Sequence, residues 1–316
     1  MALTPATTPG GDAALTGSYV RGGLLRDGWR RLRRDKVGMV GLTIMALFVL
    51  LAIFGPFLAP YNPNVGDFAQ INQGISWSHP LGTDDLGRDL LSRILAGMRT
   101  GLMVAFFVTF FSHLIGITLG AIGGYFGGIS DTIIGRMIDF TSAFPTLLLA
   151  VFVAATVGPF ISRLLTGKPD ANATIEYVVV CASLSLVLWA GVARLIRGEL
   201  LSLREREFVM AARAEGAKGR WIISKHLFPN AAGPMIVSVS LTFGGALLLE
   251  AALSFLGIGI RPPQASLGGM INEYLTQWRY HPRLVLAPTF VLALVLVSMS
   301  LVGDSVNDAL DPRRRG

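Results

Sequence analysis

Two ionisable side chains lie within long apolar stretches of the chain, where they could carry protons. Glu250 is the single charged residue between residues 233 and 256, and His113 stands among Phe, Leu and Ile residues. Ionisable groups inside a membrane are costly and usually face protein or water. We therefore treat Glu250 as a candidate pathway or gate residue, with a structural hydrogen bond as an equal alternative. For His113 a structural bond is favoured, although the pair could also form the proton relay of an ion-coupled transporter.

Other kinds of chemistry find little support in the residue pattern. The apolar stretches contain no paired acids, no metal-spaced His and no nucleophile–base pair, which argues against an intramembrane enzyme. The four scattered His and the single Cys181 predict neither a metal site nor an internal disulfide. The chain also lacks the phosphate-binding pattern G-x-x-x-x-G-K-[ST]. We expect it to be a non-enzyme that binds no cofactor and no ATP itself.

The elements that carry these residues are predicted to be membrane helices. Of the 316 residues, 52% are hydrophobic and only 15% are charged, whereas soluble domains carry about 25% charged residues. A spanning helix needs about 20 mostly apolar residues. Six stretches qualify, and we expect the third to begin after Pro145. The predicted spans are roughly residues 37–58, 101–123, 143–160, 176–196, 233–256 and 284–302.

The distribution of basic residues predicts the orientation in the membrane. Residues 1–36 carry seven Lys and Arg and residues 194–230 carry eight, whereas the three loops on the opposite side share eight. Because cytoplasmic loops are enriched in Lys and Arg, both termini and the 194–230 segment are expected in the cytoplasm. Residues 21–36 could form an amphipathic helix on the lipid surface, with a solvated basic tail as the alternative. Gly116, Gly120, Gly124 and Gly128 predict close packing of the second span against another helix.

The segment from Ser202 to Pro229 is predicted to form a helical hairpin between the fourth and fifth spans. Ser202 to Glu205 fits a capping box that would begin the first helix. Gly216 and Gly219 would then break the pattern, and Pro229 would close a second short helix. The hairpin could be a solvated loop, a nucleic-acid binder or a docking element for a cytoplasmic protein. Docking is favoured, because aromatic residues alternate with basic ones and because two spans tether the segment.

This hairpin resembles the EAA loop of ABC importer permeases. The Ala pair, the Gly and the Pro of that family's pattern stand at the right spacing, whereas Met210, His226 and Phe228 replace the usual Glu, Ile and Leu. In the family this loop is the coupling helix, which sits in a cleft of an ATPase subunit. The resemblance therefore implies an ATPase-coupling loop at residues 202–229. Its candidate residues are Glu207, Met210, Ala211, Ala212, Gly216, Trp221, His226, Phe228 and Pro229.

Two further segments resemble the dipeptide/oligopeptide/nickel group of these permeases, in its C-type subunits. The extracytoplasmic signature precedes the second span and comprises His79, Pro80, Gly82, Thr83, Asp84, Gly87, Arg88 and Asp89. We expect turns at its Gly residues, a helix cap at Thr83 or Asp84, and local salt links among its charged residues. This structural role is favoured over substrate contact. Residues 250–263 resemble the family's fifth span and following loop, although Leu267 stands where the family usually has Trp.

The resemblance implies an all-α integral membrane protein with the type I ABC importer permease fold. Residues 1–36 would be a cytoplasmic tail and amphipathic helix, 37–100 the first transmembrane helix with its extracytoplasmic loop, 101–302 the core permease domain, and 303–316 a cytoplasmic tail. The implied function is the pathway subunit of an ATP-driven importer of peptides or related solutes such as nickel chelates, in the cell inner membrane.

The resemblance also implies which partners the chain would have. These would be a second homologous permease subunit, two cytoplasmic ABC ATPases that carry ATP and Mg, an extracytoplasmic solute-binding protein and membrane lipid, but no nucleic acid. The rival is an ion-coupled secondary transporter that uses His113 and Glu250. Such transporters often show internal repeats, and we find none.

Overall fold

Six long apolar helices dominate the computed structural model, which describes residues 23–166 and 173–310. Each of the six predicted spans corresponds to one of them, so the predicted all-α membrane architecture is confirmed. Apart from one isolated β-bridge between Thr83 and Asp89, the secondary structure of the described residues is helical. The six helices are α2 (Lys36–Leu58), α3 (Leu90–Phe126), α5 (Thr146–Thr166), α6 (Ala173–Leu203), α9 (Phe228–Phe255) and α11 (Pro282–Leu310).

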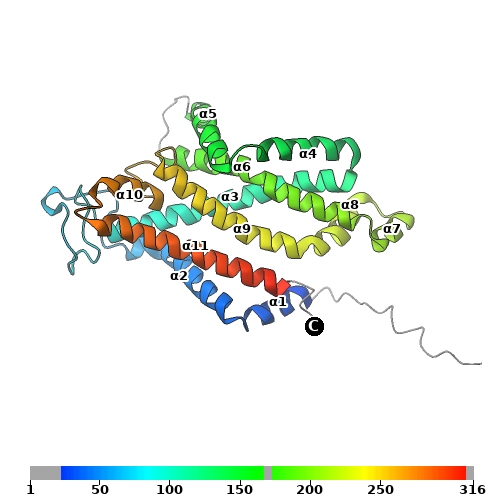
Figure 1. Cartoon of the computed structure of the whole chain (residues 1–316), viewed down its shortest axis with the longest axis horizontal. Helices are drawn as coiled ribbons and strands as arrows, with labels where there is room; N and C mark the ends of the chain where they lie inside the picture. Colours follow the sequence, from blue (N-terminus) through cyan, green and yellow to red (C-terminus); the bar gives the residue numbers. More distant parts are fainter. Residues whose placement is uncertain (1–22, 167–172, 311–316) are drawn as a thin grey trace, which may run out of the picture.

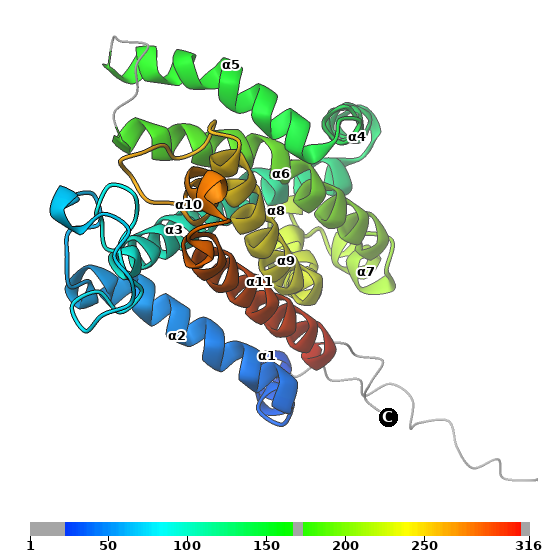
Figure 2. The ribbon, with the colours of Figure 1, turned by 60° about the vertical axis from the view of Figure 1, so that its left-hand side comes forward.

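The helices are arranged as a bundle with two distinct ends (Figure 1). The long loop between α2 and α3 lies at one end, together with α10 (Leu267–Tyr274). The short helices α7 (Glu207–Ala214) and α8 (Gly219–Ile222) lie at the other end. The amphipathic segment predicted near the N-terminus forms α1 (Gly23–Leu32), which packs against α11. Figure 2 shows α1 beside the start of α2 and the C-terminal end of α11.

Several helices extend beyond their predicted limits. The second span begins at Leu90 rather than near residue 101, because the Asp89 carboxylate caps the helix by accepting a hydrogen bond from the Ser92 amide at 2.8 Å. The predicted boundary at residues 100/101 therefore falls inside α3. The sixth span continues to Leu310, so residues 303–310 are helical. The rest of the predicted C-terminal tail and residues 1–22 lie outside the described residues.

A helix that the sequence analysis did not predict follows α3 directly. Helix α4 spans Gly128–Ser142, in a segment that was assigned to a loop. Ile134 and Ile138 on one face are buried against α3 and α6, whereas Asp131 carries an ion pair to Arg197 on another face, with an Oδ1–Nε distance of 2.5 Å. Charged residues interrupt the apolar pattern, which is why hydropathy alone does not mark this segment.

The small residues of α3 pack directly against α6. A Cβ atom added to Gly116, Gly120 or Gly124 would lie 2.7–2.9 Å from a backbone carbonyl oxygen of α6. Close packing was predicted from this spacing, and it occurs within the chain. Gly128 is different, because an added Cβ there would meet no atom within 4 Å.

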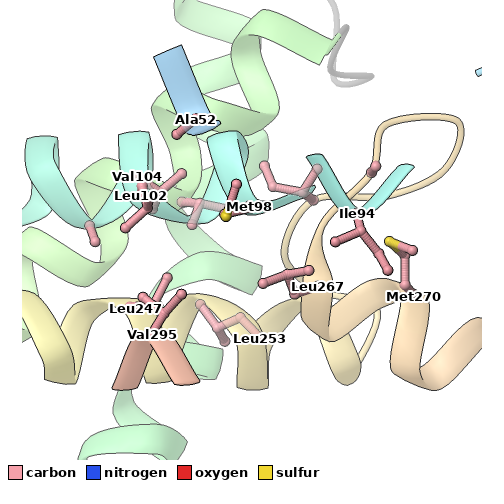
Figure 3. Packing of buried hydrophobic residues seen from close by; sticks show 14 of the residues in the cluster. Ala52, Ile94, Met98, Leu102, Val104, Leu247, Leu253, Leu267, Met270 and Val295 are labelled. Carbon is pink, nitrogen blue, oxygen red and sulfur yellow. The ribbon is translucent and has the colours of Figure 1, made fainter. Parts of the chain in front are cut away.

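The largest apolar core draws buried residues from seven helices, namely α2, α3, α5, α6, α9, α10 and α11. Figure 3 shows Met98 and Leu102 of α3 facing Leu247 and Leu253 of α9. Helices α2, α10 and α11 add Ala52, Met270 and Val295 to the same cluster. Leu267, which occupies the position of the expected Trp, is 2% exposed and belongs to this core. This packing holds α10 and its preceding loop against the ends of α3 and α9.

Candidate functional site

The predicted hairpin forms, although its boundaries differ from those expected. Helix α6 continues through Ser202 and ends at Leu203, so Ser202 does not cap α7 and the predicted capping box is wrong. Instead, Arg206 occupies the N-cap position without a side-chain capping bond. The reason is that Leu200 and Leu203 pack into the apolar cluster beneath the hairpin and keep the end of α6 helical.

The second half of the hairpin runs without interruption into the fifth span. Gly216 has a φ of +82°, which supplies the turn after α7. Gly219 begins α8, and a π-helical turn over Ile223–Leu227 joins α8 to α9. Pro229 does not close a helix as predicted. It lies in the first turn of α9, where a missing amide proton breaks no helical hydrogen bond.

One face of the hairpin is fastened to the bundle. Val209, Ala212, Ile222 and Leu227 are buried, together with Leu200 of α6, in a single apolar cluster. A cation–π contact adds to this, since the Arg213 guanidinium carbon lies 5.4 Å from the ring centre of Tyr125 on α3. The hairpin therefore has a rigid inner side.

The other face exposes large apolar side chains among charged ones. Phe208, Met210 and Trp221 are 39%, 54% and 48% exposed. The ring of His226 lies between two of them, with centroid distances of 5.9 Å to Phe208 and 4.8 Å to Trp221. Of the other predicted coupling residues, Glu207, Ala211 and Pro229 are also exposed, whereas Phe228 is partly buried. An exposed aromatic cluster of this kind is typical of a protein docking surface.

At the opposite end, the predicted signature forms a buried ion network. Asp84 Oδ2 lies 2.6 Å from Arg88 Nε and accepts a hydrogen bond from the Tyr274 hydroxyl at 2.9 Å. Glu273 of α10 binds Arg88 at 2.5 Å and Arg93 at 2.8 Å. The salt link between Asp84 and Arg88 was expected. Glu273 was missed because it lies about 185 residues further along the chain, with no local pattern around it.

The electrostatics of this network follow from burial and charge. Burial alone would lower the pKa of Arg88, but the Glu273 hydrogen bond and the Asp84 charge outweigh it, so the pKa is raised. Burial also raises the pKa of the Tyr274 hydroxyl. The pKa of the Asp85 carboxyl is raised by burial and by the negative charges of Asp84 and Glu273. Within the described residues Asp85 forms no salt bridge, unlike its neighbours.

The rest of the signature shapes the backbone around this network. Gly82 and Gly87 have φ values of +77° and +72°, so both make the expected turns. The predicted cap at Thr83 or Asp84 is wrong, since Asp89 caps α3 instead. Asp89 also pairs with His79, whose Nδ1 lies 2.9 Å from Oδ1. The Thr83 hydroxyl donates to the Gln70 carbonyl and so fastens the loop.

Glu250 and His113 each have partners of their own. Glu250 is 1% exposed and accepts a hydrogen bond from the Ser254 hydroxyl at 2.9 Å. Ser254 in turn accepts from the Ile260 amide at 3.0 Å, which ties α9 to the following loop. His113 bonds the Thr109 carbonyl at 2.9 Å and the Ser238 hydroxyl at 3.0 Å. A structural hydrogen bond was one of the two alternatives for each residue, and each residue has such a bond. In the described part of the chain, no hydrogen bond joins Glu250 to His113.

Comparison with known proteins identifies the family. The model for "binding-protein-dependent transport system inner membrane component" matches residues 116–316, and that for the "N-terminal TM domain of oligopeptide transport permease C" matches residues 23–74. The chain belongs to the family of binding-protein-dependent transport system inner membrane components. It is a multi-pass membrane protein and a permease of a transport system. Across residues 23–166 and 173–310, no three His, Cys, Asp or Glu residues could hold a metal ion.

Relatives of this permease are similar over most of its length. It is 38% identical to the dipeptide transport system permease protein DppC of Alkalihalophilus pseudofirmus, over 92% of this chain and 90% of that protein. It is 33% identical to the oligopeptide permease OppC of Bacillus subtilis, over the same shares. It is 34% identical to the glutathione permease GsiD of Escherichia coli O6:H1, over 91% and 90%. Among solved structures, an inward-facing MetNI methionine ABC transporter chain matches with a TM-score of 0.55 and 18% identity, over 69% of this chain and 96% of that one. This match supports the predicted type I importer fold.

Proposed function

We propose that this permease is the pathway subunit of an ATP-driven peptide importer, in which the hairpin at residues 202–229 receives the motion of a partner ATPase. The observation that carries the proposal is the hairpin itself. Its inner side is packed onto the bundle, its outer side exposes Phe208, Met210 and Trp221, and both of its ends continue into spans.

The continuous helical run from the hairpin into the fifth span explains how force would pass from the ATPase to the membrane helices. A push on Trp221 in α8 acts directly on α9, because the helical run from Gly219 to Phe255 has no loop in it. The same push reaches α3 through Arg213 and Tyr125. Motion of the docked partner would therefore move whole spans as rigid bodies, which is the mechanical requirement of alternating access.

The proposed assembly follows from this role. The hairpin and both termini face the cytoplasm, in line with the excess of Lys and Arg on that side. Two ABC ATPases would dock on the hairpins of this chain and of a second homologous permease, and they would hold ATP and Mg. A solute-binding protein would deliver cargo at the end that carries α10. This chain would hold no cofactor.

The proposed cargo is a peptide. The named relatives transport dipeptides, oligopeptides and glutathione, all of which contain amide-linked amino acids. Nickel chelates remain a related class within the same group of permeases. Selection among these cargoes would rest mainly on the binding protein, since no pattern in this chain singles out one peptide.

Reconstitution tests the coupling role. The permease, its partner permease and their ATPases are placed in liposomes with the binding protein, and uptake of labelled dialanine is measured with and without ATP. Trp221→Ala should abolish most ATP-driven uptake and release the ATPase during purification. Phe152→Ala, which removes an exposed ring on α5, should leave ATPase binding intact. Uptake that persists with no ATPase present would overturn the proposal in favour of an ion-coupled transporter.

A further inference from the structure

A cavity of about 700 Å³ opens at the end of the bundle opposite the hairpin. It is bounded by the end of α2, the chain that follows it, the first turns of α3, the start of α6 and the loop before α10. Its volume lies within the range of about 300–1,000 Å³ that is common for small-molecule sites. Its polar lining includes Asn64, Ser92, Arg99, Thr100, Tyr177 and Gln264.

Arg99 supplies an unpaired positive charge to this cavity. Neighbouring arginines are all engaged, since Arg88 and Arg93 bind Glu273 and Arg261 binds Glu176 at 3.0 Å. Arg99 has no hydrogen bond or ion pair with any residue that the structure describes. A guanidinium presents several donors in a planar fork, which fits a carboxylate better than any neutral group. Arg99 is exposed, so its free guanidinium is open to an anionic ligand that enters the cavity.

Neutral polar groups line the same space. The hydroxyls of Thr100 and Tyr177 lie 3.3 Å apart and can each bond a ligand. Each hydroxyl can accept a hydrogen bond as well as donate one, so a ligand that brings an N–H group would be favoured there. The cavity thus offers a cation and hydroxyl acceptors together.

Two contacts hold this space open. The Arg261–Glu176 ion pair ties the loop that carries Gln264 to the start of α6. The Tyr61 amide donates to the Ser92 hydroxyl at 3.3 Å, which fastens the chain after α2 to α3. The walls therefore come from elements that are bonded to each other, and the cavity does not depend on a single mobile side chain.

We propose that this cavity is a subsite for the C-terminal end of a transported peptide. Arg99 binds the terminal carboxylate, and the paired hydroxyls of Thr100 and Tyr177 accept a hydrogen bond from a backbone N–H of the same peptide. The required chemistry is an anion with a neighbouring N–H donor, which an ethanolamine lipid headgroup also carries. The choice of a peptide as the ligand rests on the proposed function. The inference adds that the permease itself, and not only the binding protein, contacts the peptide.

Arginine modification tests the subsite in the assembled complex. The complex is embedded in phosphatidylcholine nanodiscs and treated with phenylglyoxal, and labelling at each arginine is measured by mass spectrometry. Dialanine at about ten times its dissociation constant should slow labelling of Arg99 about tenfold, because an occupied site is not labelled. Dialaninamide, which lacks the carboxylate, should give no protection. Arg279, exposed at the same end but outside the cavity, is the internal control and should label equally in all samples.

Two further arms complete the test. Arg99→Gln should weaken dialanine binding about tenfold in saturation-transfer NMR, whereas Arg279→Gln should not change it. Protection of Arg99 by phosphatidylethanolamine nanodiscs but not by dialanine would overturn the proposal and assign the cavity to lipid. Equal protection by dialanine and dialaninamide, or none by either, would also overturn it. Because labelling needs neither ATP nor transport, a failure of the proposed function would show in the uptake assay and leave this result intact.

Discussion

The carboxylate of Glu273 lies 2.8 Å from the guanidinium of Arg93, although 180 residues separate them in the chain. The same carboxylate binds Arg88, which is also paired with Asp84. Arg88 and Arg93 are almost fully buried, with side chains 4% and 1% exposed. One acid on α10 thus binds an arginine just before α3 and another in its first turn, and it joins the extracytoplasmic signature to a distant part of the chain.

Removing Glu273 should destabilise the permease strongly. Glu273→Ala leaves the buried guanidinium groups of Arg88 and Arg93 with Asp84 as their remaining acid, at 2.6 and 3.7 Å. The loss should therefore be at most the about 3–5 kcal/mol that a fully broken buried pair costs. We expect a clear fall in the midpoint of thermal unfolding in detergent. Glu205→Ala removes an exposed acid, whose side chain is 76% exposed and lies 3.7 Å from Arg204. That variant should change stability by less than about 1 kcal/mol. Equal midpoints for the two variants would contradict the role of Glu273.

Gly216 should control how well the hairpin transmits motion. Its φ of +82° is unfavourable for a β-branched residue, although an added Cβ would meet no atom within 4 Å. Gly216→Val should therefore tilt α8 relative to α7 and reduce uptake per ATP hydrolysed. Gly216→Asn is the control, because Asn tolerates this conformation better. Uptake and ATPase activity are measured together in liposomes. If the Val and Asn variants gave the same ratio of uptake to ATP hydrolysed, the backbone conformation at Gly216 would not govern coupling.

The Asp131–Arg197 ion pair should make stability depend on pH. The hydrogen bond from Arg197 lowers the pKa of the Asp131 carboxyl below its ordinary value of 3.8. A carboxyl whose pKa is lowered by folding stabilises the folded state at any pH above its pKa in the unfolded chain. That contribution is lost as the pH falls through its pKa in the folded protein. The midpoint of wild type should therefore exceed that of Asp131→Asn at neutral pH, and the difference should vanish in acid once the pH is below the lowered pKa of Asp131 in the folded protein.

Asp139→Asn serves as the matched control for this pH dependence. Its partner Arg194 lies 3.9 Å away, and both side chains are more than half exposed. Such a pair is screened by water and contributes little. A pH-independent difference between wild type and Asp131→Asn would show that lost packing, and not the titration of Asp131, explains the effect.

Glu250→Gln should preserve ATP-driven transport. The amide oxygen of Gln can still accept the hydrogen bond from Ser254, which lies 2.9 Å from the carboxylate. If Glu250 only ties α9 to the following loop, uptake with ATP should stay within about twofold of wild type. Glu250→Ala removes the acceptor and should lower stability. Uptake that collapses in the Gln variant at unchanged stability would instead indicate a proton-carrying role.

Much of this permease could be predicted from local pattern. Six apolar stretches of sufficient length predicted six spans. A helix in lipid must form its backbone hydrogen bonds within itself, so the signal for a span lies within one continuous segment. The same holds for the turns at Gly82 and Gly87, and for the close approach at Gly116, Gly120 and Gly124. Motif resemblance added the family, since 79–89 and 202–229 each carry their pattern within about 30 residues.

Only the tertiary structure decided which distant groups meet. Glu273 has no local pattern that predicts its contacts with Arg88 and Arg93. Helix α4 was missed because charged residues interrupt its apolar pattern, and its burial against α3 and α6 appears only in the folded structure. The helix limits at Asp89 and Ser202 also changed, because capping and apolar packing outweighed the local signals there. The Arg99 cavity belongs to the same class. Whether a guanidinium has a hydrogen-bond partner depends on which distant residues folding places beside it. The residue pattern within one segment does not predict this.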